Sequence, residues 1–485
     1  MHRVCIHGHF YQPPREDPET GSIIPQPSAS PFPDWNHRIT AECYRANVGA
    51  AVLGQTGDVI ERLRTYDFIS FNFGPTLLRW MTQHAPDVVA ALVESDAASA
   101  ERLGHGNAVA QAYHHLILPL ATDRDKRTEV RWGAADFAYR FGRPADGMWL
   151  PETAVDTATL EVIAAEGIRF VILAPRQAAA VRGPGAGASW EDVHERSLVP
   201  GRPYRVELPS GRSIAAFFYA PGPAEGVAFG GWLDNGEQMA HRLADEPGPL
   251  VHFATDGESY GHHHRHGEMA LAYCIRTLRE RQDVELTNHA AELARGPVTW
   301  SARIVEESSW SCAHGVGRWS RNCGCTMDGN LSMQQEWRVH LRDGLDWLRD
   351  ALADFSEAEA DRLGVDLWAL RDAYIFHLLG QESGVSHPLD PLAGVPGEDR
   401  HRLHQLLELQ RHALMMFTSC GWFFDDPARV EPVQILRYAR RAMVLHEALG
   451  GRSLEGGLMD RLAPIRSIEP GIRDGRDLWL RRVLR

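Results

Sequence analysis

Short apolar runs alternate with longer segments of mixed character along the first half of the chain. The clearest runs are residues 3–6, 68–72, 170–173 and 250–254. Runs of this length without polar alternation are typical of strands buried in a parallel sheet. The segments between them, such as 41–63 and 128–141, are predicted to be helical. This alternation predicts an α/β fold.

The pattern changes in two later regions. Residues 178–250 are rich in Gly, Pro and Ala, and contain a hairpin-like pair of segments, 204–208 and 213–219. From residue 334 onward the segments become long and helical, as in 336–352, 366–379, 405–417 and 432–449. We therefore expect an α/β domain over residues 1–320 with an insertion near 178–250, followed by an α-helical C-terminal domain over 321–485.

Composition limits the class of protein. The chain has 485 residues, 44% of them hydrophobic and 24% charged, which is typical of a globular protein with a large core. A formal net charge of −14 argues against nucleic-acid or membrane-surface binding. Neither a targeting segment nor an apolar stretch long enough to span a bilayer is expected. Seven scattered cysteines, an odd number, favour a cytoplasmic location. The sequence does not predict an oligomeric state.

Three of the cysteines, Cys312, Cys323 and Cys325, lie close together in the sequence with His314. Zinc-binding thiolates usually come in pairs two or more residues apart, whereas Cys323 and Cys325 have a single residue between them. The sequence therefore predicts that these thiols line a packed loop, and that the protein holds no metal.

Two acidic motifs each follow an apolar run. They are the segment 147–152, which ends in Glu152, and the segment 255–258, which contains Asp256 and Glu258. The ends of parallel strands converge on one face, so these carboxyls are expected to meet. Two carboxyl groups, one ionised and one protonated, are what cleavage of a glycosidic bond requires. Glu152, whose backbone is fixed by Trp-Leu-Pro, is the candidate nucleophile. Asp256 is the candidate general acid/base, with Glu258 as its rival.

Histidines lie beside these motifs. His7 and His9 fall on the same side of the first strand, so both can reach sugar hydroxyls or hold the nucleophile ionised. The His-rich run 262–266 could bind metal, tune the acid/base or form a solvated turn. We expect one or two of its members, His262 among them, to line the site.

Residues 306–322 mix aromatic, charged and small side chains without a helical or strand period. Such a segment indicates a functional loop. Its Trp310 and Trp319 have the flat faces that stack on sugar rings, while polar neighbours bind hydroxyls.

Four stretches of the chain resemble, in the same order, the conserved regions of glycoside hydrolase family 57. They are His-Gly-His-Phe-Tyr-Gln-Pro at 7–13, Tyr-His-His-Leu-Ile-Leu-Pro-Leu at 113–120, Gly-Met-Trp-Leu-Pro-Glu at 147–152 and Thr-Asp-Gly-Glu at 255–258. Glu-Ser-Ser-Trp at 307–310 is a weaker match to a fifth region. The resemblance covers residues 1 to about 320.

The resemblance implies a distorted (β/α)7 barrel followed by a helical domain, and a retaining α-glucan-active hydrolase or transferase of the amylase, 4-α-glucanotransferase or branching type. It implies Glu152 as nucleophile, Asp256 as general acid/base, and no metal or other cofactor. His9 and His115 would flank the donor sugar. The full set of expected substrate-binding residues is His7, His9, Gln12, His115, Trp149, Glu258, His262, Trp310 and Trp319. The Cys-rich segment 311–325 and the His run depart from the family pattern and indicate a divergent subgroup.

Two other functions remain open from the residues. A metal-dependent carbohydrate deacetylase or hydrolase could use His7, His9, Asp256 and the His-rich run 262–266 as ligands, although the chain has no compact ligand motif of that kind. A non-catalytic glycan-binding protein would use the same side chains without cleaving a bond.

Overall fold

The computed structural model describes residues 1–185, 187–193, 198–327 and 334–484, and the chain divides into two compact units. The first, called here the sheet unit, comprises Met1–Gln12, Pro25–Gln111 and Phe137–Glu306. The second, the helical unit, comprises Pro13–Ile24, Ala112–Asp136 and Glu307–Arg485. Two short segments of the N-terminal half therefore group with the C-terminal helices, a grouping that cannot be read from a single boundary near residue 320.

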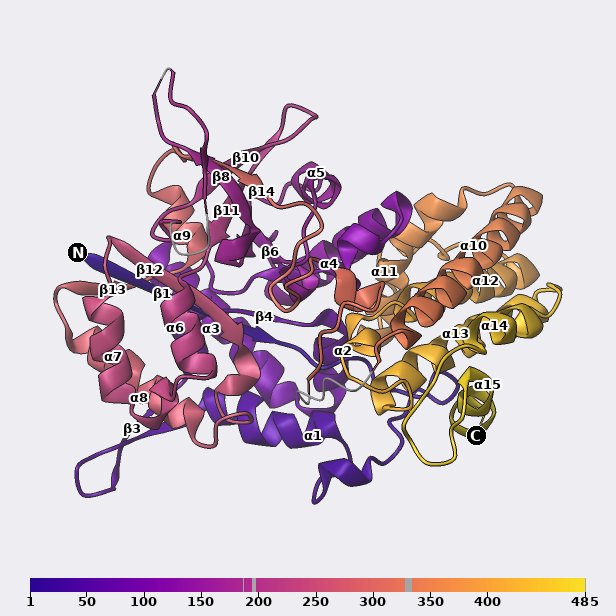
Figure 1. The fold of residues 1–485 in the computed structure, drawn as a ribbon, viewed down its shortest axis with the longest axis horizontal. Coiled ribbons are helices and arrows are strands. Elements are labelled where there is room, and N and C mark those ends of the chain that lie inside the picture. Colours follow the sequence, from indigo (N-terminus) through magenta and orange to yellow (C-terminus); the bar gives the residue numbers. More distant parts are fainter. Residues whose placement is uncertain (186, 194–197, 328–333, 485) are drawn as a thin grey trace. The chain divides into compact units, whose positions relative to one another are not determined.

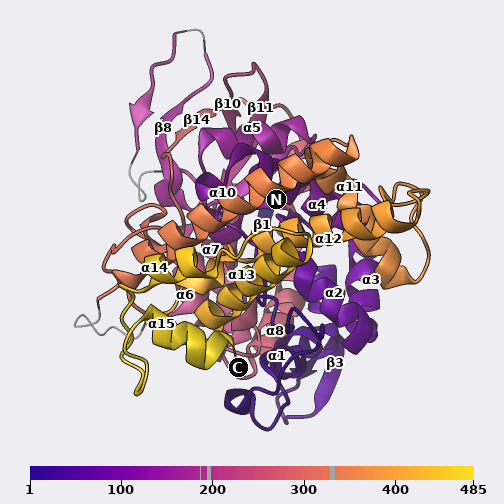
Figure 2. The same ribbon diagram turned by 90° about the vertical axis from the view of Figure 1, so that its right-hand side faces the viewer.

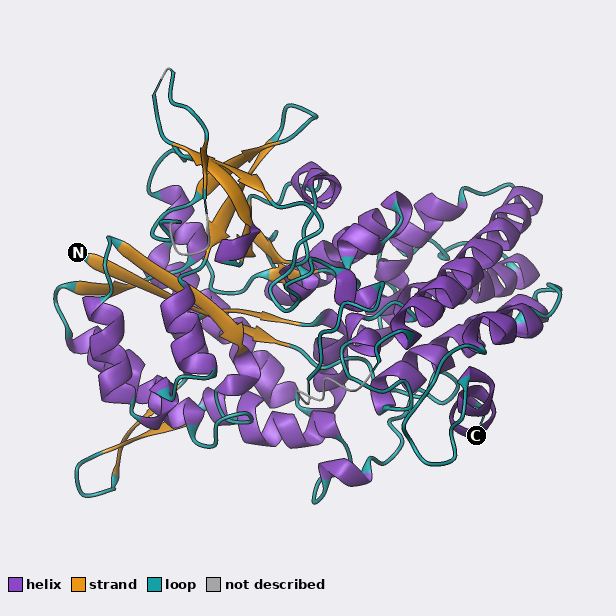
Figure 3. Ribbon diagram, in the orientation of Figure 1, coloured by secondary structure: helices purple, strands orange, loops and turns teal. Residues whose placement is uncertain are grey.

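Strand β1 (His2–Phe10) is the centre of the first sheet (Figure 3). It pairs in parallel with β12 (Leu250–Asp256) on one side, and with β4 (Ser70–Phe73) and β13 (Val284–Leu286) on the other. Every residue from Val4 to Phe10 is buried, which explains the apolar run Val4–Ile6 and places His7 and His9 in the protein interior.

A second sheet of eight strands has the order β5-β6-β7-β11-β10-β14-β8-β9. Its strands are β5 (Ala110–Gln111), β6 (Gly147–Trp149), β7 (Phe170–Leu173), β8 (Ala178–Arg182), β9 (Glu191–Asp192), β10 (Tyr204–Glu207), β11 (Ser213–Phe218) and β14 (Ser301–Ile304). β5, β6, β7 and β11 pair in parallel. Between the sheets, Phe71 forms an isolated bridge with Ala108, and the Ala220 N–H donates to the His252 carbonyl. The α/β class is confirmed, while closure of the strands into a (β/α)7 barrel stays a prediction.

Two local expectations had different outcomes. The hairpin expected around residues 204–219 is confirmed, since β10 and β11 pair antiparallel. The helix expected over residues 41–63 is wrong: the segment ends in an antiparallel pair, β2 (Ala50–Leu53) and β3 (Val59–Leu63). Gly54 and Gly57 form the turn between these strands, and Gly57 has a φ of 83°, which ends any helical period.

Helices cover the sheets (Figure 1). In the sheet unit α6 packs on β12, and α8 packs on α7 and β13. The helices of this unit are α1 (Trp35–Ile39), α2 (Pro75–His84), α3 (Pro86–Leu103), α5 (Thr157–Ala165), α6 (Pro221–Ala228), α7 (Gly236–Asp245), α8 (Gly267–Glu280) and α9 (His289–Ala294). α4 (Asp123–Phe141) begins in the helical unit and confirms the helix expected at 128–141.

The helical unit confirms the four long C-terminal helices. Its helices are α10 (Trp337–Leu363), α11 (Leu367–Ser383), α12 (Gly397–Met415), α13 (Val430–Ala448), α14 (Glu455–Leu462) and α15 (Gly475–Leu478). α10, α12 and α13 lie side by side in both views (Figure 2). Trp132, Tyr374 and Leu378 belong to one buried cluster of this unit. None of the helices described is long and apolar enough to cross a bilayer.

Candidate active site

The two candidate catalytic carboxyls lie where strands of the sheet unit end. Asp256 is the last residue of β12, and Glu152 lies in the short turn Pro151–Thr153 that follows β6. Glu152 and Thr153 have φ angles of 57° and 50°, in the left-handed region that such residues rarely adopt. Backbone strain of this kind is tolerated where the surrounding structure must hold a side chain in one place. The turn therefore fixes the direction of Glu152.

Asp256 is exposed, and the pKa of its carboxyl is raised. It lies opposite His9 in the register of β1 and β12. The residue is exposed, yet the surrounding protein desolvates its carboxyl and raises its pKa to about 7, and the negative charge of Glu152 adds to the shift. A carboxyl that is partly protonated near neutral pH can give a proton to a leaving group.

Glu258 differs from Asp256 in burial. Its side chain is 5% exposed, and one oxygen accepts hydrogen bonds from the Tyr11 N–H at 3.0 Å and the Tyr44 hydroxyl at 2.6 Å. Desolvation, followed by the charge of Asp256, raises the pKa of Glu258 to about 8. Asp256 is exposed, whereas Glu258 is held in the interior by these two hydrogen bonds, and its candidacy as the acid stays a prediction. Its expected contact with substrate stays a prediction.

His7 and His9 are tied together by Asn72 of β4. The Asn72 side-chain oxygen lies 3.0 Å from His7 Nε2, and its nitrogen lies 2.9 Å from His9 Nδ1. In this arrangement His7 donates from Nε2 while His9 Nδ1 accepts, so the His9 ring is neutral. Burial lowers the pKa of each imidazole to about 3, which agrees with the hydrogen bonds. The sequence left open whether His7 and His9 are neutral or charged, and these pKa values favour the neutral form.

Trp149 packs against the imidazole rings of His7 and His9. Its ring is fully buried and stacks on His7 at 5.0 Å and on His9 at 4.8 Å between centroids. A ring held in this way sets the position of His9 next to Asp256. Direct contact between Trp149 and a sugar stays a prediction.

Several residues of the site were not anticipated from the sequence. They are Asn72, Gln111, Tyr44, His252 and His289. The Asn72 amide also donates to Gln111 at 2.7 Å, and Gln111 lies opposite Trp149 in the register of β5 and β6. His252 and His289 are buried and face each other at 5.3 Å. Each of these residues lies in or next to an apolar run, where a lone polar side chain would have been the signal.

Gln12 and His262 also belong to the sheet unit. The Gln12 amide donates to the carbonyl of Tyr11 at 2.9 Å. His262 Nδ1 lies 2.6 Å from a carboxylate oxygen of Glu42, and the His262 ring meets Trp35 edge-on at 5.9 Å. The role of both residues toward a substrate stays a prediction.

The remaining expected site residues, His115, Trp310 and Trp319, belong to the helical unit. His115 is buried with a φ of 62°, and its Nδ1 lies 2.6 Å from the Ser419 hydroxyl. Trp319 is fully buried and donates to the Ser419 carbonyl at 3.1 Å, whereas Trp310 is partly exposed. Trp319 is therefore part of the packing of this unit. The predicted contacts of all three with substrate are untested by this structure.

A metal site at the carboxyls would need several ligands gathered there. Among the residues the structure describes, one group of His, Cys, Asp and Glu side chains has that geometry, and it consists of Cys312, His314, Cys323 and Cys325. His7, His9 and Asp256 form no such group. The ligand set that a metal-dependent deacetylase requires is thus missing from the strand ends.

Two family models match the chain. Residues 56–295 match glycosyl hydrolase family 57, and residues 333–485 match a domain of unknown function, DUF3536. No curated protein matches the sequence. The first match covers the strand-end carboxyls Glu152 and Asp256. Residues 56–295 thus match glycosyl hydrolase family 57, and the resemblance that the motifs indicated is confirmed.

Solved structures share the fold. The exo-type maltose-forming amylase from Pyrococcus sp. ST04 is 14% identical, with a TM-score of 0.70 over 98% of this chain and 88% of that protein. The branching enzyme from Pyrococcus horikoshii is 13% identical, with a TM-score of 0.56 over 95% of this chain and 94% of its own. The family 57 branching enzyme from Thermococcus kodakaraensis is 15% identical, with a TM-score of 0.53 over 95% and 94%. At these identities the likeness concerns the fold.

Proposed function

We propose that this protein is a retaining enzyme acting on α-glucans, with Glu152 as nucleophile and Asp256 as general acid/base. The observation that carries the proposal is that Glu152 and Asp256 both lie at strand ends of the segment matching family 57, where desolvation, followed by the negative charge of Glu152, raises the pKa of Asp256 to about 7. The similar folds of a maltose-forming amylase and two branching enzymes support α-glucans as the substrate class.

The proposed chemistry follows from the two environments. Asp256, protonated in part near neutral pH, gives its proton to the glycosidic oxygen as the bond to the anomeric carbon breaks. Glu152 attacks the anomeric carbon and forms a covalent glycosyl-enzyme. Asp256, now ionised, removes a proton from water or from a sugar hydroxyl that attacks the intermediate. Water gives hydrolysis, and a sugar hydroxyl gives transfer.

The neighbours of the carboxyls fit this cycle. Neutral His9, held by Asn72 and Trp149 opposite Asp256, can hydrogen-bond to sugar hydroxyls without adding a charge. A cation there would stabilise the ionised form of Asp256 and lower its pKa, so that little of the carboxyl would carry a proton near neutral pH. We also propose a cytoplasmic location, because the seven cysteines form no disulfide in the part of the chain that the structure describes.

Azide rescue with an activated aryl α-maltoside tests both roles. The full chain would be prepared as wild type, Glu152→Ala and Asp256→Ala, with Glu237→Gln, an exposed carboxyl of α7, as matched control. Without its nucleophile, the Glu152 variant should use azide to give a β-glycosyl azide. The Asp256 variant should form the glycosyl-enzyme and give the α-glycosyl azide. The control should keep wild-type activity.

Native glucans then separate hydrolysis from transfer. Glycogen, amylose and a maltooligosaccharide ladder would be incubated with wild type, and the products resolved before and after debranching. Shorter chains alone indicate hydrolysis, redistributed lengths indicate disproportionation, and new debranching-sensitive chains indicate branching. Unchanged glucans together with no azide product from either alanine variant would refute the proposal and favour a non-catalytic glycan-binding protein.

A further inference from the structure

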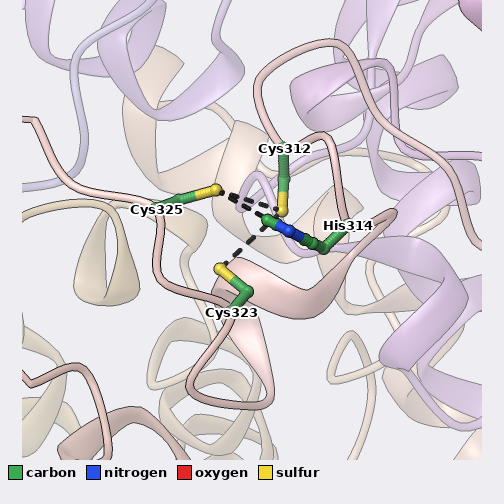
Figure 4. Close-up of side chains that lie close together, drawn as sticks. All are labelled: Cys312, His314, Cys323 and Cys325. Carbon is green, nitrogen blue, oxygen red and sulfur yellow. Dashed lines mark hydrogen bonds between the residues drawn. The ribbon is translucent and has the colours of Figure 1, made fainter.

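The Cys-rich loop before α10 brings four potential metal ligands together (Figure 4). Cys312, His314, Cys323 and Cys325 each offer one ligand atom, and all four atoms lie within 4.8 Å of one another. Cys312-Ala313-His314 and Cys323-Gly324-Cys325 each place two ligands with one residue between them. These four residues, called here the thiol cluster, take no part in the proposed glycan chemistry.

The spacing of the ligand atoms matches one tetrahedral ion. The Cys312 sulfur lies 3.9 Å from that of Cys323 and 3.8 Å from that of Cys325, and the Cys325 sulfur lies 3.5 Å from His314 Nδ1. With Zn–S bonds of about 2.3 Å and a Zn–N bond of about 2.05 Å, tetrahedral geometry gives S···S of about 3.8 Å and S···N of about 3.5 Å. The sulfurs are too far apart for a disulfide, and all are free thiols. They are also closer than a cluster of several irons would hold them.

Two buried arginines supply positive charge beside the sulfurs. Arg338 is fully buried, donates to the Cys325 carbonyl at 3.0 Å and approaches the Cys323 sulfur at 3.9 Å. Arg318 is 4% exposed and also interacts electrostatically with Arg338. The buried carboxylate Asp425, 3.9 Å from Arg338, compensates one of these charges. Three thiolates and one imidazole on a divalent cation carry one net negative charge, which would compensate the second.

We propose that Cys312, His314, Cys323 and Cys325 bind a structural zinc ion. Four protein ligands close the tetrahedron and leave no position for water or substrate, so the ion has no catalytic task. A mixed set of thiolates and imidazole in tetrahedral geometry favours zinc over magnesium or calcium, which prefer oxygen. The ion would cross-link two turns of the loop that carries Trp310 and Trp319. This proposal is the opposite of the prediction made from the sequence, which was that the protein holds no metal.

Metal analysis of the full chain is the first test. Protein purified without a polyhistidine tag from zinc- and iron-supplemented medium should carry one zinc per chain by elemental analysis. Cys323→Ser should lose the zinc, while Cys420→Ser, a partly exposed thiol of the same unit outside the thiol cluster, should keep it. Zinc-free wild type, or one iron per chain in its place, would overturn the proposal.

Cobalt substitution tests the ligand set without a variant that could misfold. Wild type stripped by a chelator and titrated with Co²⁺ should develop the intense visible bands of tetrahedral cobalt and a thiolate-to-metal charge-transfer band, both saturating at one ion per chain. Zn²⁺ should abolish these bands at one equivalent and protect three of the seven thiols from a thiol reagent. Weak octahedral bands, or thiols that react equally with and without Zn²⁺, would refute the site. Neither readout uses a glucan, so failure here leaves the proposed activity standing.

Discussion

Replacing Glu258 by glutamine should leave the stability of the protein unchanged at acid pH and raise it at alkaline pH. The wild-type carboxyl is 5% exposed and accepts hydrogen bonds from the Tyr11 N–H and the Tyr44 hydroxyl. The carbonyl of glutamine can accept the same two bonds but never becomes charged. Glu258→Gln therefore mimics the protonated wild type at every pH.

The size of the effect follows from the pKa of Glu258, which rises from 4.5 to about 8 on folding. The folded state holds the proton where the unfolded state has lost it, so stability is lost as pH rises from about 4.5 to about 8. At about 1.4 kcal/mol for each pH unit, the full shift sets an upper limit of about 5 kcal/mol. Structural relaxation and water entry reduce such penalties, and we expect about 2–3 kcal/mol.

Unfolding of wild type, Glu258→Gln and the surface control Glu237→Gln would be followed by tryptophan fluorescence from pH 5 to pH 9. At pH 5 all three should unfold at the same temperature. At pH 9 Glu258→Gln should unfold about 4–6 °C above the other two, at about 2 °C per kcal/mol for a unit of this size. A difference between Glu258→Gln and wild type that is the same at pH 5 and pH 9 would refute the raised pKa.

Three further predictions concern the same strand ends. A methyl group on Gly257 would lie 2.3 Å from the Phe10 ring, so Gly257→Ala should cost about 1–3 kcal/mol of stability, measured by denaturant unfolding, and should lower kcat. Asn72→Ala removes the amide between two buried imidazoles, and the loss of each hydrogen bond should cost about 1–3 kcal/mol in the same assay. Glu152→Gln removes a negative charge beside Asp256, so the pKa of Asp256 should fall and the alkaline limb of the azide-rescued rate should move to lower pH. If the alkaline limb of the pH–rate profile does not move, desolvation alone raises the pKa of Asp256.

The strands of the sheet unit could be predicted because burial on both faces leaves a plain trace in the sequence. β7 and β12 begin at the residues where their apolar runs begin, and β1 begins within one residue of its run. The pattern failed at residues 41–63, where two short strands with exposed faces resemble an irregular helix in apolar content. Burial depends on the whole fold. A half-exposed hairpin has few buried positions, so its sequence shows only a weak hydrophobic pattern.

The thiol cluster marks another limit of sequence reasoning. Spacing rules for zinc describe ligands that come from one tight turn, as in paired thiols two residues apart. In this chain two turns, at 312–314 and 323–325, each supply a pair with a single intervening residue, and the loop between them brings the pairs together. The approach of one turn to the other depends on tertiary packing around Arg338, which no local spacing encodes.

Asp256 and Glu258 show why the roles of neighbouring acids needed the structure. From the sequence both were candidates for the acid, since one residue separates them after the same strand. The strand ends at Asp256, and the turn Gly257–Ser259 directs Glu258 inward to Tyr11 and Tyr44. Gly257 makes this turn possible, because a side chain there would collide with Phe10. One carboxyl is therefore exposed, and the other is held in the interior by hydrogen bonds from Tyr11 and Tyr44, where its raised pKa of about 8 keeps it largely uncharged at neutral pH.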